Sequence, residues 1–500
     1  MLEEPAREDS IETPAVPSRP RGAPFLRDTI EAFVVAVVLA LVVKQFAVEA
    51  YKVPTGSMEP TIVGDEFSGD RILVNKLVPL IRDPRRWEIW VFQYPNDRRI
   101  NFIKRVVGIG PESLFIIDGD LYTAPLGSSR ESTERLYRDG KLQIARKPRP
   151  VQDALFANFP QVRPELLDRP SQIDFQKSWI CDPSPIQGAS SWIFHDEGVR
   201  AQARGDGTYA TFRRPIKDRT NCFADLSAEN AFGEYVVGDV RLSLSARPIA
   251  GGGFVVVEIV DPQQGSRLLA RIPIAGESEN GALMVEDVKK SDLGDLRLPV
   301  DVATDIVFTN VDDQVFLRID DQRFGPIDNS HPPSYNARGF GHMQKIRFGV
   351  EAATVDFNNC GVYRDIYYRD GSLDRFDIPA GNFCFLGDNS AASKDSREWV
   401  GVTVITEDGE TIYGDSEAIL DPDDLQARQD NPYRADVLAG GAGDTRNWFI
   451  DQFGRRHQLG AGPRPWQTLV RDHSPLVGRE LLMGRAFSVF LPVSRLGIVR

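Results

Sequence analysis

The apolar positions of the chain first gather in one long run near the amino terminus. Residues 32–43 are all apolar, and the run extends over 30–48 only if Glu31, Lys44 and Gln45 are accepted near its ends. A spanning helix needs about 20 such residues, whereas the core of a cleavable signal peptide needs roughly 7 to 15. Because long terminal side chains can reach the membrane surface, we expect a retained transmembrane helix over residues 29–48. Cleavage after this run is the alternative.

The charges before this run predict its orientation. Residues 1–28 are rich in Pro, Glu and Arg without an apolar period, which is typical of a disordered tail. Arg19, Arg21 and Arg27 precede the span, and positive residues favour the cytoplasmic side. We therefore expect a cytoplasmic amino terminus, with everything after about Tyr51 on the outer face.

Short apolar runs follow, separated by Gly, Pro and Asp. They lie at residues 71–74, 89–92, 100–107 and 114–117, a spacing that predicts strands. Residues 49–123 should therefore form a β-rich unit. Residues 124–231 show little periodicity, and we expect a loop-rich connector there.

Alternation returns in residues 232–380, where many short apolar segments at even spacing predict an antiparallel β-sandwich. Residues 381–500 resume the character of the first unit. The closing stretch 484–499 is interrupted by Pro492, Ser494 and Arg495, so a strand and tail are expected rather than a second span. The fold class is thus mainly β with one amino-terminal transmembrane helix.

Composition excludes some classes of function. The formal net charge of −13 over 500 residues argues against nucleic-acid binding, which depends on Lys and Arg neutralising phosphates. The four cysteines are scattered, without the close pair that a structural zinc site needs, and we expect no metal or cofactor. A disulfide is permitted if the chain is exported, but the pairing of Cys181, Cys222, Cys360 and Cys384 stays open.

Three segments suggest chemistry. Residues 54–61 read Pro-Thr-Gly-Ser-Met-Glu-Pro-Thr, which suits a serine on a rigid turn. Residues 102–108 read Phe-Ile-Lys-Arg-Val-Val-Gly and place a lysine in an apolar strand, where burial lowers the pKa of an amine. Residues 387–397 pack Asp, Ser and Arg closely, as a rigid hydrogen-bonded site requires. Taken singly, each would more often be structural.

The order and content of these segments resemble the bacterial type I signal peptidase, or leader peptidase, family. Residues 69–76 and the closing Gly-Arg-Ala of 484–486 agree with it, whereas Ile109-Gly110-Pro111-Glu112 departs from the usual Leu-Pro-Gly-Asp. The resemblance covers residues 29–123 and 381–500, which it makes two parts of one catalytic domain. The intervening 124–380 would be an insertion, whose second half is similar to a laminin-G or concanavalin-like sandwich.

The resemblance implies a Ser-Lys dyad that needs no histidine, metal or cofactor. Ser57 would be the nucleophile and Lys104 its base, with the Ser57 backbone N–H and the Thr55 hydroxyl holding the oxyanion. Ser393 would orient the amine, and Asp395 with Arg397 would brace the site. Shallow apolar pockets for the substrate would be lined by Tyr51, Val53 and Pro54 on one side and by Phe102 and Ile103 on the other.

The function implied is removal of signal peptides from exported preproteins after small residues, at Ala-X-Ala sites, on the outer face of the bacterial cytoplasmic membrane. The partners would be preproteins and the lipid bilayer, with the ligand of the insertion unidentified. Two alternatives remain. One is a soluble self-cleaving Ser-Lys protease, against which the apolar run argues. The other is an anchored binding module for a glycan or protein, with an inactive protease core.

Overall fold

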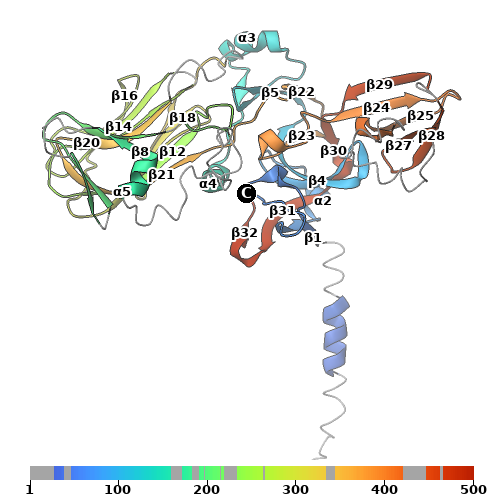
Figure 1. Ribbon diagram of the computed structural model, residues 1–500, viewed down its shortest axis with the longest axis horizontal. Coiled ribbons are helices and arrows are strands. Elements are labelled where there is room, and N and C mark those ends of the chain that lie inside the picture. Colours follow the sequence, from blue (N-terminus) through green and yellow to red (C-terminus); the bar gives the residue numbers. More distant parts are fainter. Residues whose placement is uncertain are drawn as a thin grey trace, which may run out of the picture. The chain divides into compact units, whose positions relative to one another are not determined.

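The computed structural model describes eleven stretches of the chain, which contain helices, strands and the turns between them. They are residues 28–38, 47–158, 172–182, 191–195, 198–213, 215–218, 233–262, 265–333, 344–420, 446–461 and 466–500. The chain divides into two units, Met1–Glu49 and Ala50–Arg500. The described part is mainly β (Figure 1), as the apolar pattern predicts.

In the first unit, residues 28–38 form a helix with exposed side chains. Within the described stretches, no helix is both long and apolar enough to span a bilayer. The expected span over 29–48 includes residues 39–46, and the expected tail includes residues 1–27. Both of these segments lie outside the described residues.

An eight-stranded sheet, called here the first sheet, joins strands that are far apart in the sequence. In spatial order its strands are β1 (Val48–Lys52), β2 (Arg71–Asn75), β31 (Leu482–Leu491), β3 (Ile89–Tyr94), β4 (Asp97–Ile109), β23 (Asn382–Leu386) and β30 (Leu476–Gly478), with β32 (Gly497–Ile498) on β31. The expected strands at 71–74, 89–92 and 100–107 are thus confirmed, as is the carboxy-terminal strand. That strand pairs antiparallel with both β2 and β3.

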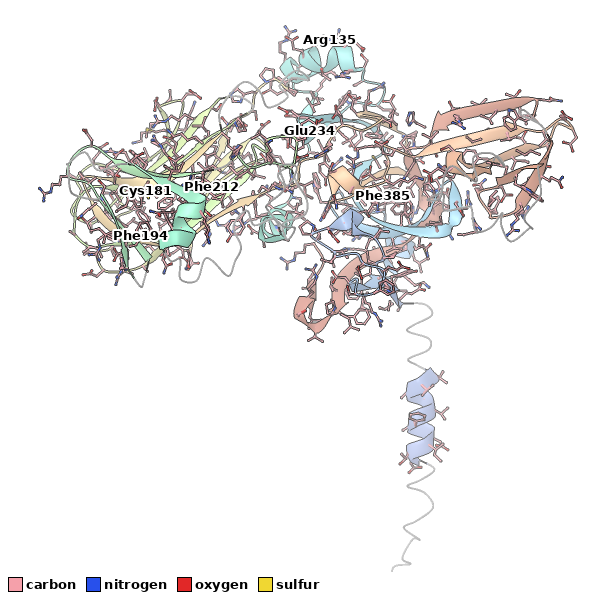
Figure 2. All side chains as sticks on the ribbon, viewed as in Figure 1. Arg135, Cys181, Phe194, Phe212, Glu234 and Phe385 are labelled. Carbon is pink, nitrogen blue, oxygen red and sulfur yellow. The ribbon has the colours of Figure 1, made fainter. Side chains whose placement is uncertain are left out.

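The first sheet has an apolar cluster on each face. Along β3, Ile89 and Val91 belong to one cluster, while Trp90 and Phe92 belong to the other. Phe385, which Figure 2 labels, packs against Phe92 with ring centroids 4.2 Å apart. Because both faces are covered, β3 reads as an unbroken apolar run rather than an alternating one.

A smaller four-stranded sheet lies next along the chain. Its strands, in spatial order, are β22 (Arg375–Ile378), β5 (Glu112–Ile117), β6 (Asp120–Ala124) and β7 (Gln143–Ile144). Within its described residues, the second unit has the α-helices α2 (Val78–Ile81), α3 (Thr133–Arg138), α4 (Arg149–Asn158) and α5 (Gln172–Ser178). The strand expected at 114–117 is part of β5.

Two seven-stranded sheets form a sandwich. The β12 sheet has the order β19 (Gln322–Asp328), β18 (Gln314–Ile319), β17 (Thr304–Val311), β12 (Val240–Pro248), β21 (Thr354–Arg364), β10 (Gly198–Gln202) and β9 (Trp192–His195). The β13 sheet has the order β16 (Val288–Asp292), β15 (Ala282–Val285), β14 (Arg267–Pro273), β13 (Phe254–Val260), β20 (Lys345–Glu351), β11 (Thr208–Phe212) and β8 (Trp179–Cys181). The expected antiparallel sandwich is therefore present.

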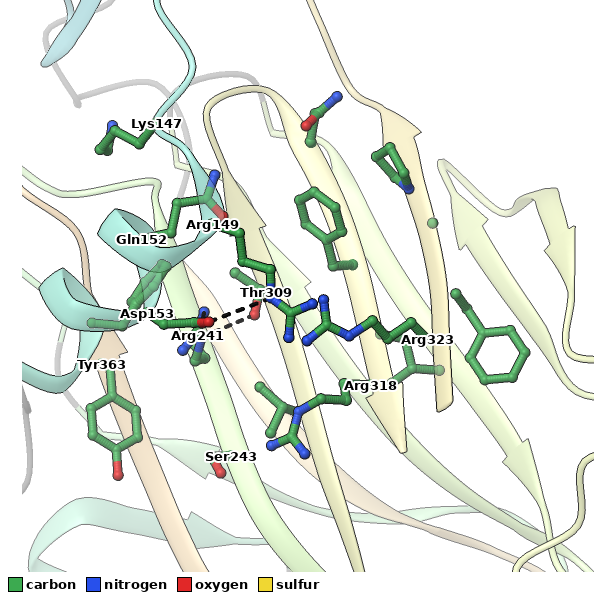
Figure 3. Close-up of a pocket in the computed structure, with 18 of the residues that line it drawn as sticks. Lys147, Arg149, Gln152, Asp153, Arg241, Ser243, Thr309, Arg318, Arg323 and Tyr363 are labelled. Atoms are coloured by element: carbon green, nitrogen blue, oxygen red, sulfur yellow. Dashed lines mark hydrogen bonds and ion pairs between the residues drawn. The ribbon is translucent and has the colours of Figure 1, made fainter. Parts of the chain in front are cut away.

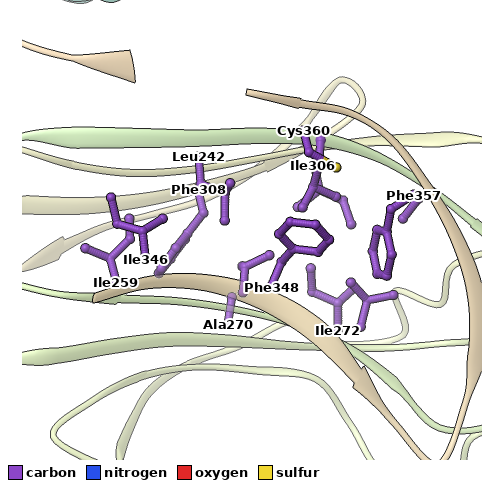
Figure 4. Packing of buried hydrophobic residues seen from close by; sticks show 14 of the residues in the cluster. Leu242, Ile259, Ala270, Ile272, Ile306, Phe308, Ile346, Phe348, Phe357 and Cys360 are labelled. Atoms are coloured by element: carbon purple, nitrogen blue, oxygen red, sulfur yellow. The ribbon is translucent and has the colours of Figure 1, made fainter. Parts of the chain in front are cut away.

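One apolar core holds the two sheets together. Leu242, Leu244 and Ala246 alternate along β12 and are buried, while the residues between them face outward. Figure 4 shows Phe308 and Phe348 among the buried side chains between the sheets.

The structure differs from expectation in residues 124–231, where a loop-rich connector was expected. Four strands of the sandwich, β8 to β11, lie there. They have three to five residues each, and one of them, β10, contains Gly, Arg and Gln. Strands this short are stabilised by pairing with longer neighbours such as β20 and β21. Three to five residues are too few to show a clear alternation of apolar and polar positions in the sequence.

Residues 400–420, 446–461 and 466–473 form a further lobe, which lies between β23 and β30 in the sequence. One of its sheets contains β25 (Thr411–Asp415), β24 (Val400–Ile405) and β29 (Thr468–His473), and the other contains β26 (Ile419–Leu420), β27 (Arg446–Ile450) and β28 (Arg456–Ala461). The lobe has its own core around Val402, Val404 and Phe449. The expectation of one continuous catalytic part over 381–500 did not include it.

Within the described residues, Cys181, Cys360 and Cys384 form no disulfide with one another. Burial raises the pKa of the Cys181 thiol to about 12, so this thiol is protonated at neutral pH. Cys222 lies outside the described residues, and the pairing question therefore stays open.

Candidate active site

Ser57 lies in a short 3₁₀ turn, Gly56–Met58, between β1 and β2. Its side chain is buried, and among the described residues no acceptor receives its backbone N–H. Gly64 allows the chain to turn tightly here, because a Cβ at that position would lie 1.7 Å from the Thr55 carbonyl oxygen. A distant part of the chain also holds this loop.

That distant part is Arg495, which follows β31. Its Nε donates to the Asp70 carboxylate at 3.0 and 3.1 Å, and its Nη2 donates to the carbonyl oxygens of Pro60 and Thr61 at 3.3 Å. Asp70 also accepts the backbone N–H of Val63 at 2.8 Å. The turn carrying Ser57 is thereby fixed against the carboxy-terminal strands.

Lys104 reaches Ser57 from β4. Its Nζ lies 2.7 Å from Ser57 Oγ and 3.1 Å from the Ile103 carbonyl oxygen. The Lys104 side chain is buried, and the Phe102 ring centroid lies 5.1 Å from Nζ. Burial lowers the pKa of the amine to about 8, although the charges of Asp395 and Asp388 partly oppose this shift.

Residues 387–397 form the wall of the site behind Lys104. Asp395 accepts two hydrogen bonds from the Arg397 side chain, at 2.8 and 2.6 Å, and one from the Gly387 N–H at 2.9 Å. Arg397 in turn donates to the Ser390 hydroxyl and carbonyl oxygens at 2.8 and 3.0 Å. Both members of the ion pair are almost fully buried, so the loop is held by charge-assisted bonds.

Ser393 lies in the same wall but makes no bond to the lysine. Its Oγ is buried and has no hydrogen-bond partner among the described residues. A Cβ on Gly387 would lie 2.2 Å from that oxygen, so the hydroxyl packs closely against the Gly387 backbone.

The remaining expected residues divide between the two faces of the first sheet. Val53 is buried in one apolar cluster, against which Tyr51 and Ile103 pack. Phe102 packs on the other face and stacks on Tyr94, with ring centroids 4.7 Å apart. Pro54 and Thr55 are exposed beside Ser57. Tyr51, Val53 and Ile103 thus lie on one face of the first sheet and Phe102 lies on the other.

A second buried ion pair beside the dyad was not expected from the sequence. Arg105, next to Lys104, donates to both carboxylate oxygens of Asp388 at 2.7 and 2.6 Å. Thr61 donates to the same carboxylate at 2.5 Å. In the sequence Arg105 and Asp388 both lie within segments that were singled out for chemistry, and this was the only available sign of the pair. A sequence does not say which charged residues pair.

One acidic cluster could hold a cation away from this site. The carboxylates of Asp120, Asp239 and Asp312 offer oxygens that lie within 4.8 Å of one another. Burial and mutual repulsion raise the pKa of Asp120 and Asp239. The Lys147 ammonium already pairs with Asp312 and with Asp365, which supplies one positive charge to the cluster.

With this geometry in place, comparison with known proteins is informative. Residues 26–155 match the family model described as signal peptidase, peptidase S26. This chain contains an S26 signal peptidase domain.

Relatives of the S26 domain include signal peptidase I of Pseudomonas aeruginosa, 38% identical over 108 residues, and that of Aquifex aeolicus, 36% identical over 88 residues. The aligned segments cover 19% and 18% of this chain. They cover 37% and 32% of the relatives, so the match spans about a third of those proteins.

Solved structures similar to the chain include a CBM66 carbohydrate binding module from Bacillus subtilis and a Bacillus licheniformis β-glucanase. The first is 14% identical, covers 37% of this chain and 95% of the module, and has a TM-score of 0.24. The second is 9% identical, covers 38% and 92%, and has a TM-score of 0.25. TM-scores this low carry no information about what the sandwich of this chain binds.

Proposed function

We propose that the chain is a membrane-bound serine endopeptidase that removes signal peptides, with Ser57 as nucleophile and Lys104 as general base. The observation that carries the proposal is the 2.7 Å separation of Ser57 Oγ and Lys104 Nζ in a buried site. Because the amine has a pKa of about 8, a useful fraction is neutral near that pH. A neutral amine can accept the serine proton.

The reaction then runs in two halves. Ser57 Oγ attacks the scissile carbonyl carbon while its proton moves to Lys104 Nζ. When the tetrahedral intermediate collapses, the C–N bond breaks and the ammonium protonates the leaving amine. Water then attacks the ester carbonyl carbon and gives a proton to Lys104 Nζ. The C–O bond to Ser57 breaks, and Ser57 Oγ takes this proton from Lys104 to become a hydroxyl again.

The oxyanion of each intermediate is proposed to be held by the Ser57 N–H and the Thr55 hydroxyl. Supporting this, the Ser57 N–H has no acceptor among the described residues and Thr55 is exposed at the start of the turn. One such donor is typically worth about 2.7 to 4 kcal/mol of transition-state stabilisation. Ser393 is proposed to act by packing near the amine, and Asp395 with Arg397 by fixing the wall behind it.

An unpaired stretch of β4 offers a place for extended substrate. Toward β23, β4 is paired only from Arg105 to Ile109, and no described strand pairs with residues 101–104 on that side. A preprotein segment could add there as a strand, with small side chains entering the site. Tyr51, Val53, Pro54, Phe102 and Ile103 are proposed to restrict their size, which would favour Ala-X-Ala sites.

The location follows from the same proposal. The catalytic domain would comprise residues 49–123 and 381–500, interrupted by the insertion 124–380, and strands from both parts do lie in the first sheet. A helix over 29–48 would anchor it on the outer face of the bacterial cytoplasmic membrane. Anchoring raises the effective concentration of the site near emerging signal peptides.

The test is cleavage of a preprotein bearing an Ala-X-Ala site by the full chain in detergent. Ser57→Ala and Lys104→Ala should each abolish cleavage, with the melting transition retained. Lys141→Ala, which removes an exposed lysine, should cleave like the wild type. Activity of Lys104→Ala, or an inactive wild type on several such preproteins, would reject the dyad and favour an anchored binding module.

A further inference from the structure

The outward face of the β12 sheet carries a groove of about 830 Å³ (Figure 3). Strand register places its side chains in two rows across the strands. One row runs Arg323, Arg318, Val307, Ser243 and Gly361, and the other runs Phe316, Thr309, Arg241 and Tyr363. All of these residues except Gly361 line the groove.

Helix α4 closes one end of this groove. Asp153 on α4 accepts a hydrogen bond from Arg241 at 2.9 Å and lies 3.4 Å from the Arg149 guanidinium. The Arg241 guanidinium also lies over the Phe156 ring, 4.2 Å from its centroid. This end of the groove is therefore built from two structural elements and is held in place.

Positive charge in the groove exceeds what its carboxylates neutralise. Arg318 and Arg323 are direct cross-strand partners, an arrangement that is unfavourable for like charges. Within the described part of the chain, neither forms an ion pair, although Arg318 donates to the Asp320 carbonyl oxygen at 2.8 Å. Figure 3 shows the guanidinium groups of Arg149 and Arg323 pointing toward one another.

Acidic side chains at the rim do not remove this excess. Asp320 and Asp321 line the groove, and one Asp320 oxygen accepts the Asp305 N–H at 2.9 Å. Asp153 is shared between two arginines. Guanidinium groups bind planar anions through paired hydrogen bonds, so the site is suited to an anionic ligand.

The position on the sheet restricts the kind of ligand. Strands β18, β17, β12 and β21 each have a neighbour on both sides, so their backbone groups cannot accept a peptide as an added strand. On these four strands recognition must come from side chains, and the groove presents hydroxyls of Ser243, Thr309 and Tyr363 beside aromatic rings. Its volume is within the range of small-ligand sites.

The geometry points to this groove as a binding site for a carbohydrate chain that carries anionic groups, either carboxylates or phosphates. Arg318 and Arg323 bind the anionic groups. The Tyr363 ring, close above Gly361 where a Cβ would lie 3.0 Å from its hydroxyl, provides a face for a sugar ring. The five strands of the first row span roughly 19 Å, which suits an oligomer. This site does not depend on the proposed peptidase activity.

The experiment is affinity electrophoresis of the full chain in detergent through gels that contain one polymer each. Polygalacturonate and alginate supply carboxylated sugars, phosphomannan supplies phosphorylated sugars, dextran is neutral, and poly-L-glutamate has carboxylates without sugars. We expect retardation by a carboxylated or a phosphorylated polysaccharide, which identifies the source of the charge, and none by dextran or poly-L-glutamate.

Two double variants with equal charge change separate the groove from general charge effects. Arg318→Ala with Arg323→Ala should weaken binding at least tenfold. Lys289→Ala with Lys290→Ala, two exposed lysines on β16 of the opposite sheet, should bind as the wild type. Melting curves check that both variants fold.

Three results would overturn the assignment. One is the absence of retardation by every anionic polysaccharide of the set. A second is equal retardation by poly-L-glutamate or dextran. The third is an equal loss of binding in the lysine variant.

Discussion

Arg105 and Asp388 form a two-bonded ion pair, and the side chains of both residues are fully buried. Removal of one partner leaves an uncompensated buried charge, which typically costs about 3 to 5 kcal/mol. Arg105→Met should therefore lower the free energy of unfolding by about that amount in urea titrations.

The exposed pair of Arg138 and Glu134 is the control for this measurement. Its atoms are 3.9 Å apart and both side chains are more than half exposed. Arg138→Met should change stability by less than about 1 kcal/mol. Equal effects of the two variants would show that Arg105 and Asp388 are not buried together.

The pKa of Lys104 predicts how cleavage depends on pH. In the proposed mechanism only the neutral amine of Lys104 accepts the Ser57 proton, so kcat/KM should rise with pH and level off above about 8. A preprotein cleavage assay between pH 6 and 10 measures this. A profile that is flat across pH 8 would contradict the assignment of Lys104 as base.

The same amine makes stability depend on pH. Its folded pKa lies below its unfolded value, so between about 8 and 10.5 the unfolded chain binds more protons and stability rises with pH. The full effect is about 3 kcal/mol. Lys104→Met should remove this rise from unfolding curves measured at pH 8 and pH 10. An unchanged rise in the variant would assign it to other groups.

Gly64 should tolerate no side chain. Since a Cβ there would lie 1.7 Å from the Thr55 carbonyl oxygen, Gly64→Ala must displace the backbone beside Ser57. We expect at least a tenfold loss of kcat/KM together with a lower melting temperature. Gly205→Ala is the matched control, because its Cβ would have no atom within 4 Å, and wild-type activity is expected. Full activity of Gly64→Ala would show that the turn is held differently.

The acidic cluster of Asp120, Asp239 and Asp312 should make stability fall as pH rises, which is opposite to the effect of Lys104. Burial raises the pKa of Asp120 well above its usual value, so the folded chain binds the extra proton and loses stability as pH rises above about 4. Asp120→Asn should therefore unfold at higher urea than the wild type at pH 7, with the gap closing toward pH 4. Asp139→Asn, on an exposed turn, should show no such gap. A variant less stable at pH 7 would indicate that the carboxylate is needed in its charged form.

Strands that are buried on both faces could be read from the sequence, whereas short strands of mixed composition could not. The apolar run of β3 reflects clusters on its two sides, and this signal is local. The strand β10, with sequence Gly-Val-Arg-Ala-Gln, pairs with β21 more than 150 residues later. Such a strand is defined by its neighbour rather than by its own pattern.

In the candidate site, too, some residues could be identified from the sequence and others could not. Ser57 and Lys104 lie in motifs that resemble a family, so both could be named in advance. The contacts of Arg105 with Asp388 and of Arg495 with Asp70 join residues 283 and 425 positions apart. A single sequence contains charged residues but not their partners, and these two contacts therefore required the structure.

The bond between Arg495 and Asp70 also sets an order of events during synthesis. The turn carrying Ser57 leaves the ribosome long before Arg495, and the first sheet cannot pair β2 with β31 until then. Closing so long a loop is entropically slow, unless the sandwich folds first and shortens the effective distance. The turn that carries Ser57, the proposed nucleophile, should thus stay unassembled throughout most of translation. The proposed peptidase activity should therefore begin only after the chain has been made through Arg495.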